Sequence, residues 1–305
     1  MSNENQIWFN GTMVPWSQAN VHVMTHALHY GSSIFEGMRA YSTKNGSAIF
    51  RLGVHLRRLW ESCAIYRMEI PFPLAIYTQA CKDVVTVNNY AKCFLRPLVW
   101  RGEGPLGLDG HANPINAMVL AMQWDAYLGP DGLKNGVDVM VSSWSRPAAN
   151  TIPTMAKAGG NYLSSTLIKS EALRNGYAEG IAMDIHGNIA EGSGMNLFVV
   201  RDGVIYTPPT TASILPGITR DSIITLAKDL KMPVIETNMQ REMLYLADEI
   251  FFTGTAAEVT PVRSVDKVII GTGMRGELTE ALQERFFGLF DGSVDDTHGW
   301  LDYVK

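Results

Sequence analysis

The spacing of apolar residues predicts amphipathic helices in three segments of the chain. In residues 52–68, leucines and a cysteine recur every third or fourth position among charged side chains. Residues 164–176 show a weaker helical pattern that ends in a glycine suited to a helix C-cap. Residues 218–230 follow a Pro-Gly pair that can open a helix. These three segments are the helices that the pattern supports best.

Strand signals lie between and before these helices. Residues 93–102 and 115–124 are short apolar runs typical of buried strands, and a further strand-like run begins at residue 137. Near the start of the chain, Asn10-Gly11 separates two extended segments and predicts a tight hairpin turn. Strands and helices follow one another without a regular βαβ alternation. We therefore expect an α+β fold.

One segment has the composition of a linker. Glycine, proline and aspartate cluster in residues 126–136, between two strand-like runs. A chain of 305 residues is long enough for two domains. We therefore expect an N-terminal domain over residues 1–125 and a C-terminal domain over residues 137–305.

Composition narrows the class of protein. With 46% hydrophobic residues the chain can form a sizeable core, and its net charge of -5 gives no general footprint for nucleic acid or an anionic membrane. The three cysteines form no CxxC pair, which argues against a disulfide framework or a cysteine zinc site. The chain starts without a basic-then-apolar leader and has no apolar run of membrane-spanning length. We expect a soluble cytoplasmic protein.

Two motifs imitate binding sites. His22, His26 and His29 would share one face of a helix, but the flanking residues read as easily as strand and loop, and packing or hydrogen-bonding roles are favoured over a metal site. The glycines of residues 271–276 match a dinucleotide fingerprint, yet too little chain follows to supply the next strand and its acidic residue. We expect neither a metal nor a nucleotide here.

A lysine stands among small and apolar residues in "TMAKAGGNYLSS", residues 154–165. On this stretch alone, Lys157 reads most simply as a solvated loop residue. A lysine in small apolar surroundings can instead lose its proton through desolvation, and a free amine can attack an aldehyde. Lys157 is therefore a candidate nucleophile.

Three other stretches match the remaining needs of pyridoxal phosphate. Glu191 in "AEGSGMNLF" offers a carboxylate for a pyridine nitrogen. Gly217-Ile218-Thr219 stands where a turn opens a helix, the place where backbone N–H groups bind phosphate, and Gly254-Thr255-Ala256 adds a hydroxyl and amides. Taken singly, Glu191 reads as a turn residue and the Pro-Gly stretch as a helix cap.

In this order, the stretches resemble the branched-chain amino-acid aminotransferases of the fold-type IV pyridoxal-phosphate family. The resemblance covers nearly the whole chain, from "HALHYGSSIFEG" through "TIPTMAKAGGNYLSS", "AEGSGMNLF" and "LPGITRD" to "YLADEIFFTGTAAEVTPVRSVD". It implies a smaller N-terminal α/β domain, a larger C-terminal pseudo-barrel domain, and a cofactor in the cleft between them.

The resemblance also implies roles for cofactor-binding residues. Lys157 would form the internal aldimine and then move the proton between substrate and cofactor carbons. Tyr162 would hydrogen-bond the phenolic oxygen, Glu191 the pyridine nitrogen, and Leu215 would pack on the ring. The residues matched to the phosphate are Arg58, Gly217, Ile218, Thr219 and Thr255. Arg57 directly precedes Arg58, and only one of the two can easily reach the phosphate.

For the substrate, the resemblance implies leucine, isoleucine or valine as amino donor and 2-oxoglutarate as acceptor, in a ping-pong cycle. The matched residues are Phe35, Gly37, Arg96, Trp124, Tyr127, Thr255 and Ala256, with Tyr30 supplied by a neighbouring subunit of a homodimer or dimer-based hexamer. Arg96 would receive the side-chain carboxylate of glutamate. Without the resemblance, the aromatic residues read as ordinary core.

Two positions depart from the family pattern. Phe94 stands where relatives often carry a tyrosine, so a hydrogen bond to the substrate carboxylate must be absent or come from amides such as those of Thr255 and Ala256. Met195 stands where glutamate is common.

Alternative functions are another fold-type IV enzyme, such as a D-amino-acid aminotransferase or an aminodeoxychorismate lyase, and a catalytically silent ligand-binding protein.

Overall fold

The computed structural model describes residues 5–124, 127–129 and 131–305, which fall into two compact units. Unit 1 comprises residues 1–124, 156–160 and 290–305, and unit 2 comprises residues 125–155 and 161–289. The expected division at residues 126–136 assumed that the chain passes once between domains, whereas it returns to unit 1 twice. Linker composition does not record such returns, because they depend on contacts between distant segments.

The expected linker itself is only partly described. Ala126 and Pro130 lie outside the described residues. Its second half forms a short helix, α4 (Gly132–Asn135), which belongs to unit 2 and contacts β15 (Glu258–Val265). This part of the segment is therefore packed structure and not a free connection.

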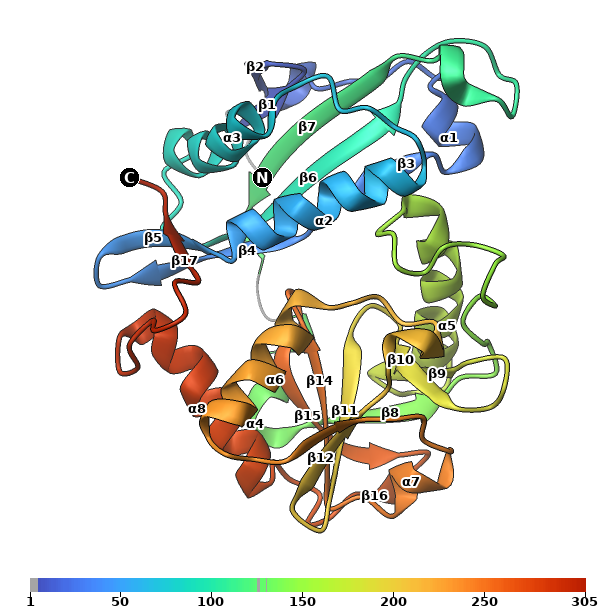
Figure 1. Ribbon diagram of the computed structural model, residues 1–305, viewed down its shortest axis with the longest axis vertical. Coiled ribbons are helices and arrows are strands. Elements are labelled where there is room, and N and C mark those ends of the chain that lie inside the picture. The colour runs from blue at the N-terminus through green and yellow to red at the C-terminus, as the bar shows by residue number, and fades with distance from the viewer. Residues whose placement is uncertain (1–4, 125–126, 130) are drawn as a thin grey trace. The chain divides into compact units, whose positions relative to one another are not determined.

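Unit 1 is built on an antiparallel sheet of eight strands among the described residues, in the order β17-β5-β4-β6-β7-β1-β2, with β3 paired to β6 (Figure 1). Its strands are β1 (Gln6–Phe9), β2 (Thr12–Pro15), β3 (Ser33–Phe35), β4 (Met38–Thr43), β5 (Gly46–Phe50), β6 (Cys93–Arg101), β7 (Ile115–Met122) and β17 (Leu301–Tyr303). Its helices are α1 (His26–Tyr30), α2 (Leu52–Ile65) and α3 (Leu74–Val87). The hairpin of β1 and β2 turns at Asn10-Gly11, both with positive φ, as predicted.

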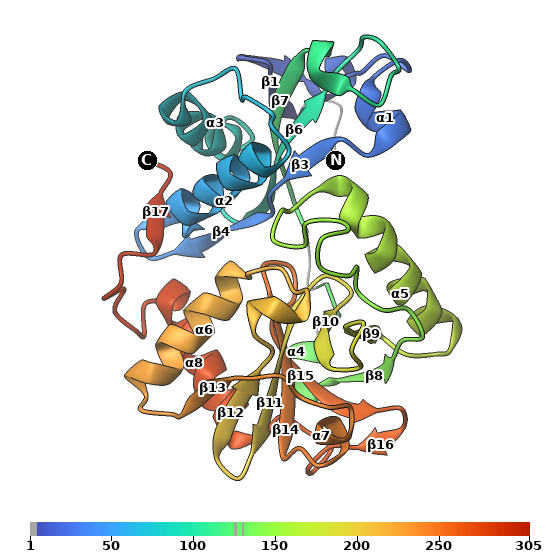
Figure 2. The ribbon, with the colours of Figure 1, turned by 45° about the vertical axis from the view of Figure 1, so that its right-hand side comes forward.

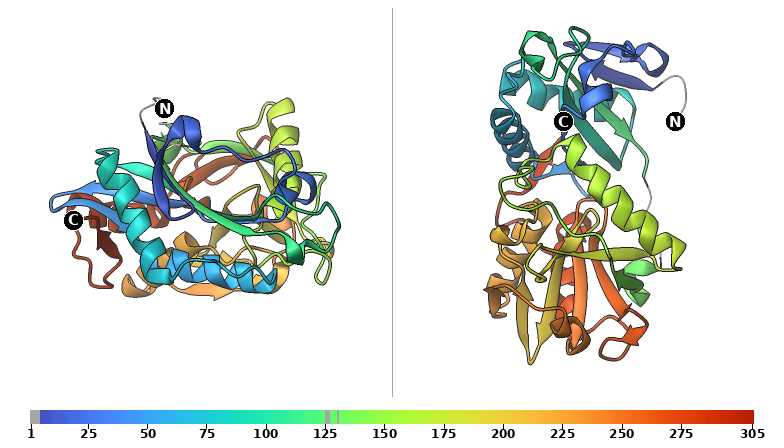
Figure 3. Two further views of the ribbon diagram at one scale, coloured as in Figure 1. Left: turned by 90° about the horizontal axis from the view of Figure 1, so that it is seen from above. Right: turned by 90° about the vertical axis from the view of Figure 1, so that its right-hand side faces the viewer.

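Helices α2 and α3 cover one face of this sheet (Figure 3). Leu56 and Leu59 of α2 are fully buried, in the same core cluster as Leu95 and Val99 of β6. Alternate residues of β6, including Arg96 and Leu98, therefore point to the opposite face. The predicted helix is confirmed, and its apolar stripe orients the polar residues between the leucines.

Unit 2 contains a mixed sheet in the order β10-β9-β8-β15-β14-β11-β12-β13, with β16 paired to β15. Its other strands are β8 (Val137–Val141), β9 (Glu179–Met183), β10 (Ile189–Gly192), β11 (Asn196–Arg201), β12 (Val204–Thr207), β13 (Val234–Glu236), β14 (Glu249–Gly254) and β16 (Val268–Ile269). Its helices besides α4 are α5 (Tyr162–Arg174), α6 (Ile218–Asp229), α7 (Glu242–Tyr245) and α8 (Glu277–Asp291), whose last two residues belong to unit 1.

The sheet of unit 2 positions two helices that carry candidate residues. Helix α5 packs on β9, where a Cβ at Gly180 would lie 2.7 Å from Ile168, and α6 contacts β14 (Figure 2). Both helices lie where the sequence predicts them. In the described part of the chain, no helix combines the length and the apolar character that crossing a bilayer requires.

Candidate functional site

Lys157 is fixed by its backbone in unit 1. Its N–H donates to Ser62 Oγ at 3.1 Å, and its carbonyl accepts from the N–H of Phe35 at 3.0 Å. The next residue, Ala158, forms a bridge with Ile34 of β3. Two backbone hydrogen bonds and one β-bridge thus hold this segment to unit 1, and the half-buried side chain of Lys157 projects from a fixed backbone.

The Phe35 ring lies between Lys157 and Arg96 in a chain of contacts on unit 1. Lys157 Nζ lies 5.0 Å from the centre of the Phe35 ring, and the guanidinium carbon of Arg96 lies 4.5 Å from the same ring. Arg96 also lies 5.2 Å from the ring of Phe94, which contacts Trp124 edge to face at 4.5 Å. Three predicted residues of unit 1, Phe35, Arg96 and Lys157, therefore form one group, and Trp124 is joined to it through Phe94.

Gly37 completes this group through its lack of a side chain. A Cβ at Gly37 would lie 2.7 Å from Cζ of Phe94, closer than real Cβ contacts allow. Phe94 is itself buried at 3% exposure. The Phe94 ring thus packs directly on the Gly37 backbone and on Arg96.

Arg58 is held by a buried carboxylate that sequence reasoning missed. Glu36 accepts from Arg58 Nε at 2.6 Å and from Arg58 Nη2 at 2.9 Å, and it also accepts from His55 Nδ1 at 2.7 Å. Glu36 and His55 are almost fully buried, whereas Arg57 is exposed. The geometry therefore separates Arg58 from Arg57, since only Arg58 is oriented by this pair.

Burial alone would raise the pKa of Glu36, but the positive charge of Arg58 and the hydrogen bonds from Arg58 and His55 hold it well below its usual range. Burial lowers the pKa of His55, as do the charges of Arg58 and Lys157, against the opposing effect of Glu36. His55 is then neutral at neutral pH and acts on Glu36 as a hydrogen-bond donor. The result is an ionised carboxylate that fixes the plane of the Arg58 guanidinium.

In unit 2, Glu191 of β10 is a buried carboxylate with three donors. Its Oε2 accepts from Asn196 Nδ2 at 3.0 Å and from the N–H of Leu215 at 3.2 Å. Its Oε1 lies 3.1 Å from Nη2 of Arg146, and both side chains are nearly buried. This arrangement favours the ionised carboxylate and fixes its orientation.

Asn196 links Glu191 to the loop before α6. The same Nδ2 group that donates to Glu191 also donates to the carbonyl of Leu215 at 2.9 Å. A Cβ at Gly217 would lie 1.9 Å from Asn196 Oδ1, so the glycine makes room for this amide. Gly217 is the N-cap of α6 and has no side chain to cap it, so the N–H groups of Ile218 and Thr219 begin a helix suited to an anion.

The other predicted residues of unit 2 lie on three elements. Tyr162 is the first residue of α5, and half-buried Thr255 and Ala256 form the turn between β14 and β15. Tyr127 faces Lys169, whose Nζ lies 4.9 Å from its ring. Burial and the nearby Glu179 carboxylate raise the pKa of Tyr127, partly opposed by Lys169.

The contacts of Tyr30 are with other residues than those around Lys157. It ends α1, is 45% exposed, and donates its hydroxyl to the carbonyl of Leu106 at 2.7 Å. His26 precedes it on the same helix and is buried in hydrogen bonds to Ser32 and Gly107. The segment that contains His26 and His29 is thus helical, which the strand-and-loop interpretation missed, while the hydrogen-bonding role fits His26.

Met195 occupies an apolar position. It is 5% exposed in the core cluster of unit 2, its Cγ would lie 2.8 Å from a Cβ at Gly192, and its Cβ lies 3.4 Å from the corresponding position at Gly254. The methionine therefore packs between the strand of Glu191 and the strand before Thr255.

Sequence reasoning missed four residues that hold others in place: Glu36, His55, Arg146 and Asn196. A signal existed for His55 and Arg58, which stand three apart on a predicted helix and so share a face. Asn196 follows Glu191 within the same quoted motif. No local pattern joins Arg146 to Glu191, because the fold alone brings them together.

The Glu36–Arg58 pair predicts a stability effect. We expect Glu36→Gln to lower the free energy of unfolding at pH 7 by about 3–5 kcal/mol, because it leaves a largely buried guanidinium opposite a neutral amide. The folded-state pKa lies below the ordinary value of 4.5, so this contribution is present above pH 4.5 and is lost as pH falls further. Urea unfolding of the wild type and Glu36→Gln, measured at intervals from about pH 7 to about pH 3, shows whether the difference in their free energies of unfolding shrinks as pH falls.

Glu61→Gln is the matched control, because Glu61 is exposed on the same helix and loses the same charge. An equal effect of the two substitutions at pH 7 would show that Glu36 does not stabilise unit 1 through Arg58.

The close approach of Gly217 to Asn196 predicts an effect on the affinity for the cofactor. We expect Gly217→Ala to weaken binding of pyridoxal phosphate about 10- to 100-fold, because the new methyl group displaces Asn196 and with it a hydrogen bond to a charged group. Titration of the apoprotein with pyridoxal phosphate, followed by absorbance, measures the change. Gly194→Ala is the control, since no atom lies within 4 Å of its added Cβ. Equal affinities of the two variants would disprove the steric argument.

Comparison with known proteins shows the family to which the chain belongs. The family model described as amino-transferase class IV matches residues 33–265. The chain is 54% identical to the branched-chain-amino-acid aminotransferase of Escherichia coli K12 over 300 residues, 98% of this chain and 97% of that one.

Solved structures agree over the whole length. A crystal structure of the Escherichia coli branched-chain amino acid aminotransferase matches with a TM-score of 0.98 and 52% identity, covering 99% of this chain and 100% of that chain. The branched-chain amino acid aminotransferase from Thermobaculum terrenum, in its PLP-bound holo form, matches with a TM-score of 0.92 and 32% identity, covering 100% of both chains. The chain therefore belongs to the class IV aminotransferase family.

Proposed function

We propose that this protein transfers the amino group of leucine, isoleucine or valine to 2-oxoglutarate, with pyridoxal 5'-phosphate as cofactor. The observation that carries the proposal is the position of Lys157, held by its backbone beside Phe35 and close to Arg96. Its relatives named as branched-chain aminotransferases, at identities up to 54% over nearly the whole chain, support the same activity.

The residues present fit each functional group of this cofactor. Lys157 offers an amine to the aldehyde, Glu191 a carboxylate to the pyridine nitrogen and Tyr162 a hydroxyl to the phenolic oxygen. For the phosphate, we propose the Arg58 guanidinium together with residues at the start of α6 and Thr255. When bound, the cofactor would withdraw electrons from the substrate α-carbon.

Lys157 then has two tasks. Its amine would hold the cofactor through the aldehyde carbon, whose oxygen leaves as water, and once the substrate amine has taken its place the same nitrogen would accept the proton of the substrate α-carbon and deliver a proton to the former aldehyde carbon. The hydrogen bonds of the Lys157 backbone to Ser62 and Phe35 limit the positions that Nζ can reach. A fixed backbone with a flexible side chain suits a proton that moves between two nearby carbon atoms.

The side chains near Lys157 must accept two kinds of substrate. Phe35 and Trp124 offer apolar surface to a branched side chain, while Arg96 offers a charge to the distal carboxylate of glutamate. Because Arg96 lies over the rings of Phe35 and Phe94, its charge stands directly beside this apolar surface. We propose that amides at Thr255 and Ala256 bind the α-carboxylate, since Phe94 has no hydroxyl to offer.

Other fold-type IV activities and a silent ligand-binding role are less well supported. The relatives reported above are named branched-chain aminotransferases, and Lys157 and Glu191 are both present.

We propose the reducing cytoplasm as the location of this protein. In keeping with it, three cysteines are buried free thiols: Cys63, Cys81 and Cys93.

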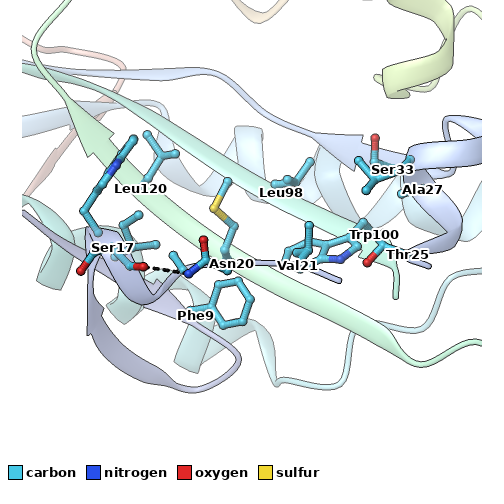
Figure 4. Close-up of a pocket in the computed structure, with 15 residues that line it drawn as sticks. Phe9, Ser17, Asn20, Val21, Thr25, Ala27, Ser33, Leu98, Trp100 and Leu120 are labelled. Carbon is cyan, nitrogen blue, oxygen red and sulfur yellow. Dashed lines mark hydrogen bonds between the residues drawn. The ribbon is translucent and has the colours of Figure 1, made fainter. Parts of the chain in front are cut away.

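We also propose that the enzyme is a homodimer or an assembly of dimers in which Tyr30 reaches the neighbouring subunit. The face of the unit 1 sheet opposite α2 and α3 carries a pocket of about 450 Å³, lined by Trp100, Leu98, Val21 and Leu28 among others (Figure 4). Leu28 is 63% exposed and lies on the same helix as Tyr30. An exposed apolar surface of this kind suits a second copy of the chain.

Lys157→Ala tests the catalytic proposal. We expect transamination of L-leucine to fall by a factor of about 10²–10⁴ or more, because both the nucleophile and the proton carrier are lost. Formation of glutamate from L-leucine and 2-oxoglutarate is the measurement. Lys92→Ala, which removes an exposed lysine of unit 1, should act as the wild type. Activity of Lys157→Ala at the wild-type rate would refute the assigned mechanism.

The subunit proposal predicts a change of mass. We expect Leu28→Glu to shift the protein toward monomer in sedimentation velocity, since it places a charge on the apolar surface by α1. Leu74→Glu, at an exposed position that starts α3, should leave the mass unchanged. A Leu28→Glu protein with the wild-type mass would exclude this surface as the interface.

A further inference from the structure

A buried arginine stands behind Glu191. The side chain of Arg146 is 5% exposed, and its Nη2 lies 3.1 Å from Glu191 Oε1. The Arg146 Nε donates to the carbonyl of Ser213 at 3.3 Å, and its backbone N–H donates to the carbonyl of Met183 at 2.8 Å. Arg146 is thus anchored by its own backbone and touches both the carboxylate and the loop that leads to Leu215.

Hydrogen bonding alone does not require this charge. Glu191 Oε2 already accepts from Asn196 and from the N–H of Leu215, both neutral donors. Burying a guanidinium costs desolvation free energy, and an apolar replacement of a buried ion pair is often no less stable. The charge of Arg146 therefore invites an explanation beyond stability.

The charge of Arg146 can be explained by its effect on where a proton resides. A carboxylate and a pyridine nitrogen bind protons with similar affinity, so a buried pair of the two can lose both charges by moving one proton onto the carboxylate. A guanidinium stays protonated at any pH of interest, and beside Oε1 it disfavours the neutral carboxyl. The proton is then left on the ring nitrogen.

We propose that Arg146 is a positioning residue that keeps Glu191 ionised and thereby keeps the ring nitrogen of the bound cofactor protonated. The inference rests on the proposed function, in which Glu191 faces that nitrogen. It adds a role for a residue that touches neither the cofactor nor the substrate in this account. The contact of Arg146 with Ser213 gives it a second effect, on the loop geometry, which the test must separate from charge.

The test is the ¹⁵N chemical shift of the ring nitrogen in protein loaded with ¹⁵N-labelled pyridoxal phosphate. We expect a protonated nitrogen in the wild type and in Arg146→Lys, which retains the charge. In Arg146→Met and Arg146→Gln, the shift should move by roughly half or more of the distance to the unprotonated reference. Arg263→Met is the matched control, because Arg263 pairs with Asp138 elsewhere on unit 2.

Each result decides between the explanations. A protonated nitrogen in whichever of Arg146→Met and Arg146→Gln folds by circular dichroism overturns the inference, as does an unprotonated nitrogen in the wild type. If Arg146→Lys shifts as far as the neutral variants, loop geometry and not charge is responsible, and the inference also fails. Failure of the wild type to bind pyridoxal phosphate at all would instead refute the proposed function.

Discussion

Buried ionised carboxylates are the constraint on which the candidate site depends. Glu36 in unit 1 and Glu191 in unit 2 are both nearly inaccessible to water, and each is paired with an arginine, Arg58 and Arg146 respectively. A carboxylate in such a place stays charged only when donors surround it. The fold supplies those donors from distant segments. They stabilise the two buried charges and fix the orientation of each carboxylate.

The two carboxylates differ in what they orient. Glu36 binds two nitrogens of Arg58 and sets the plane of a guanidinium, which we propose then faces a phosphate. Glu191 is itself the group that we propose faces the cofactor, and Arg146, Asn196 and Leu215 orient it. In both cases the residue proposed to contact a ligand is held by a buried partner, which is how a binding site remains shaped before its ligand arrives.

Short sequence patterns predicted the elements that depend mainly on neighbouring residues. The leucine spacing of residues 52–68 gave α2, and the Asn10-Gly11 pair gave the first hairpin, because both depend on neighbouring residues. Helix α3 was not predicted, although Tyr77, Ala80, Cys81 and Val84 form its buried stripe. The returns of residues 156–160 and 290–305 to unit 1 depend on pairing with β3 and β5, which no short pattern contains.

The candidate site shows the same division. Lys157 and Glu191 were identified as members of an ordered set of stretches that resembles a known family, since each alone reads as a loop or turn residue. Glu36 and Arg146 were missed because their importance comes from Arg58 and Glu191, which are distant in the sequence. The residues proposed to contact ligands thus lie in recognisable stretches, whereas the pairing of Glu36 with Arg58 and of Arg146 with Glu191 appears only once the chain is folded.

The central claim is that one lysine-bound cofactor runs both halves of the amino transfer. The visible absorption spectrum of the purified protein, recorded before and after L-leucine and then after 2-oxoglutarate, tests it most directly. The account predicts a band of the bound cofactor that fades with L-leucine and returns with 2-oxoglutarate. A band that L-leucine leaves unchanged, or that responds only to D-alanine, would contradict the substrate assignment, and a protein without a band after reconstitution would contradict the cofactor chemistry itself.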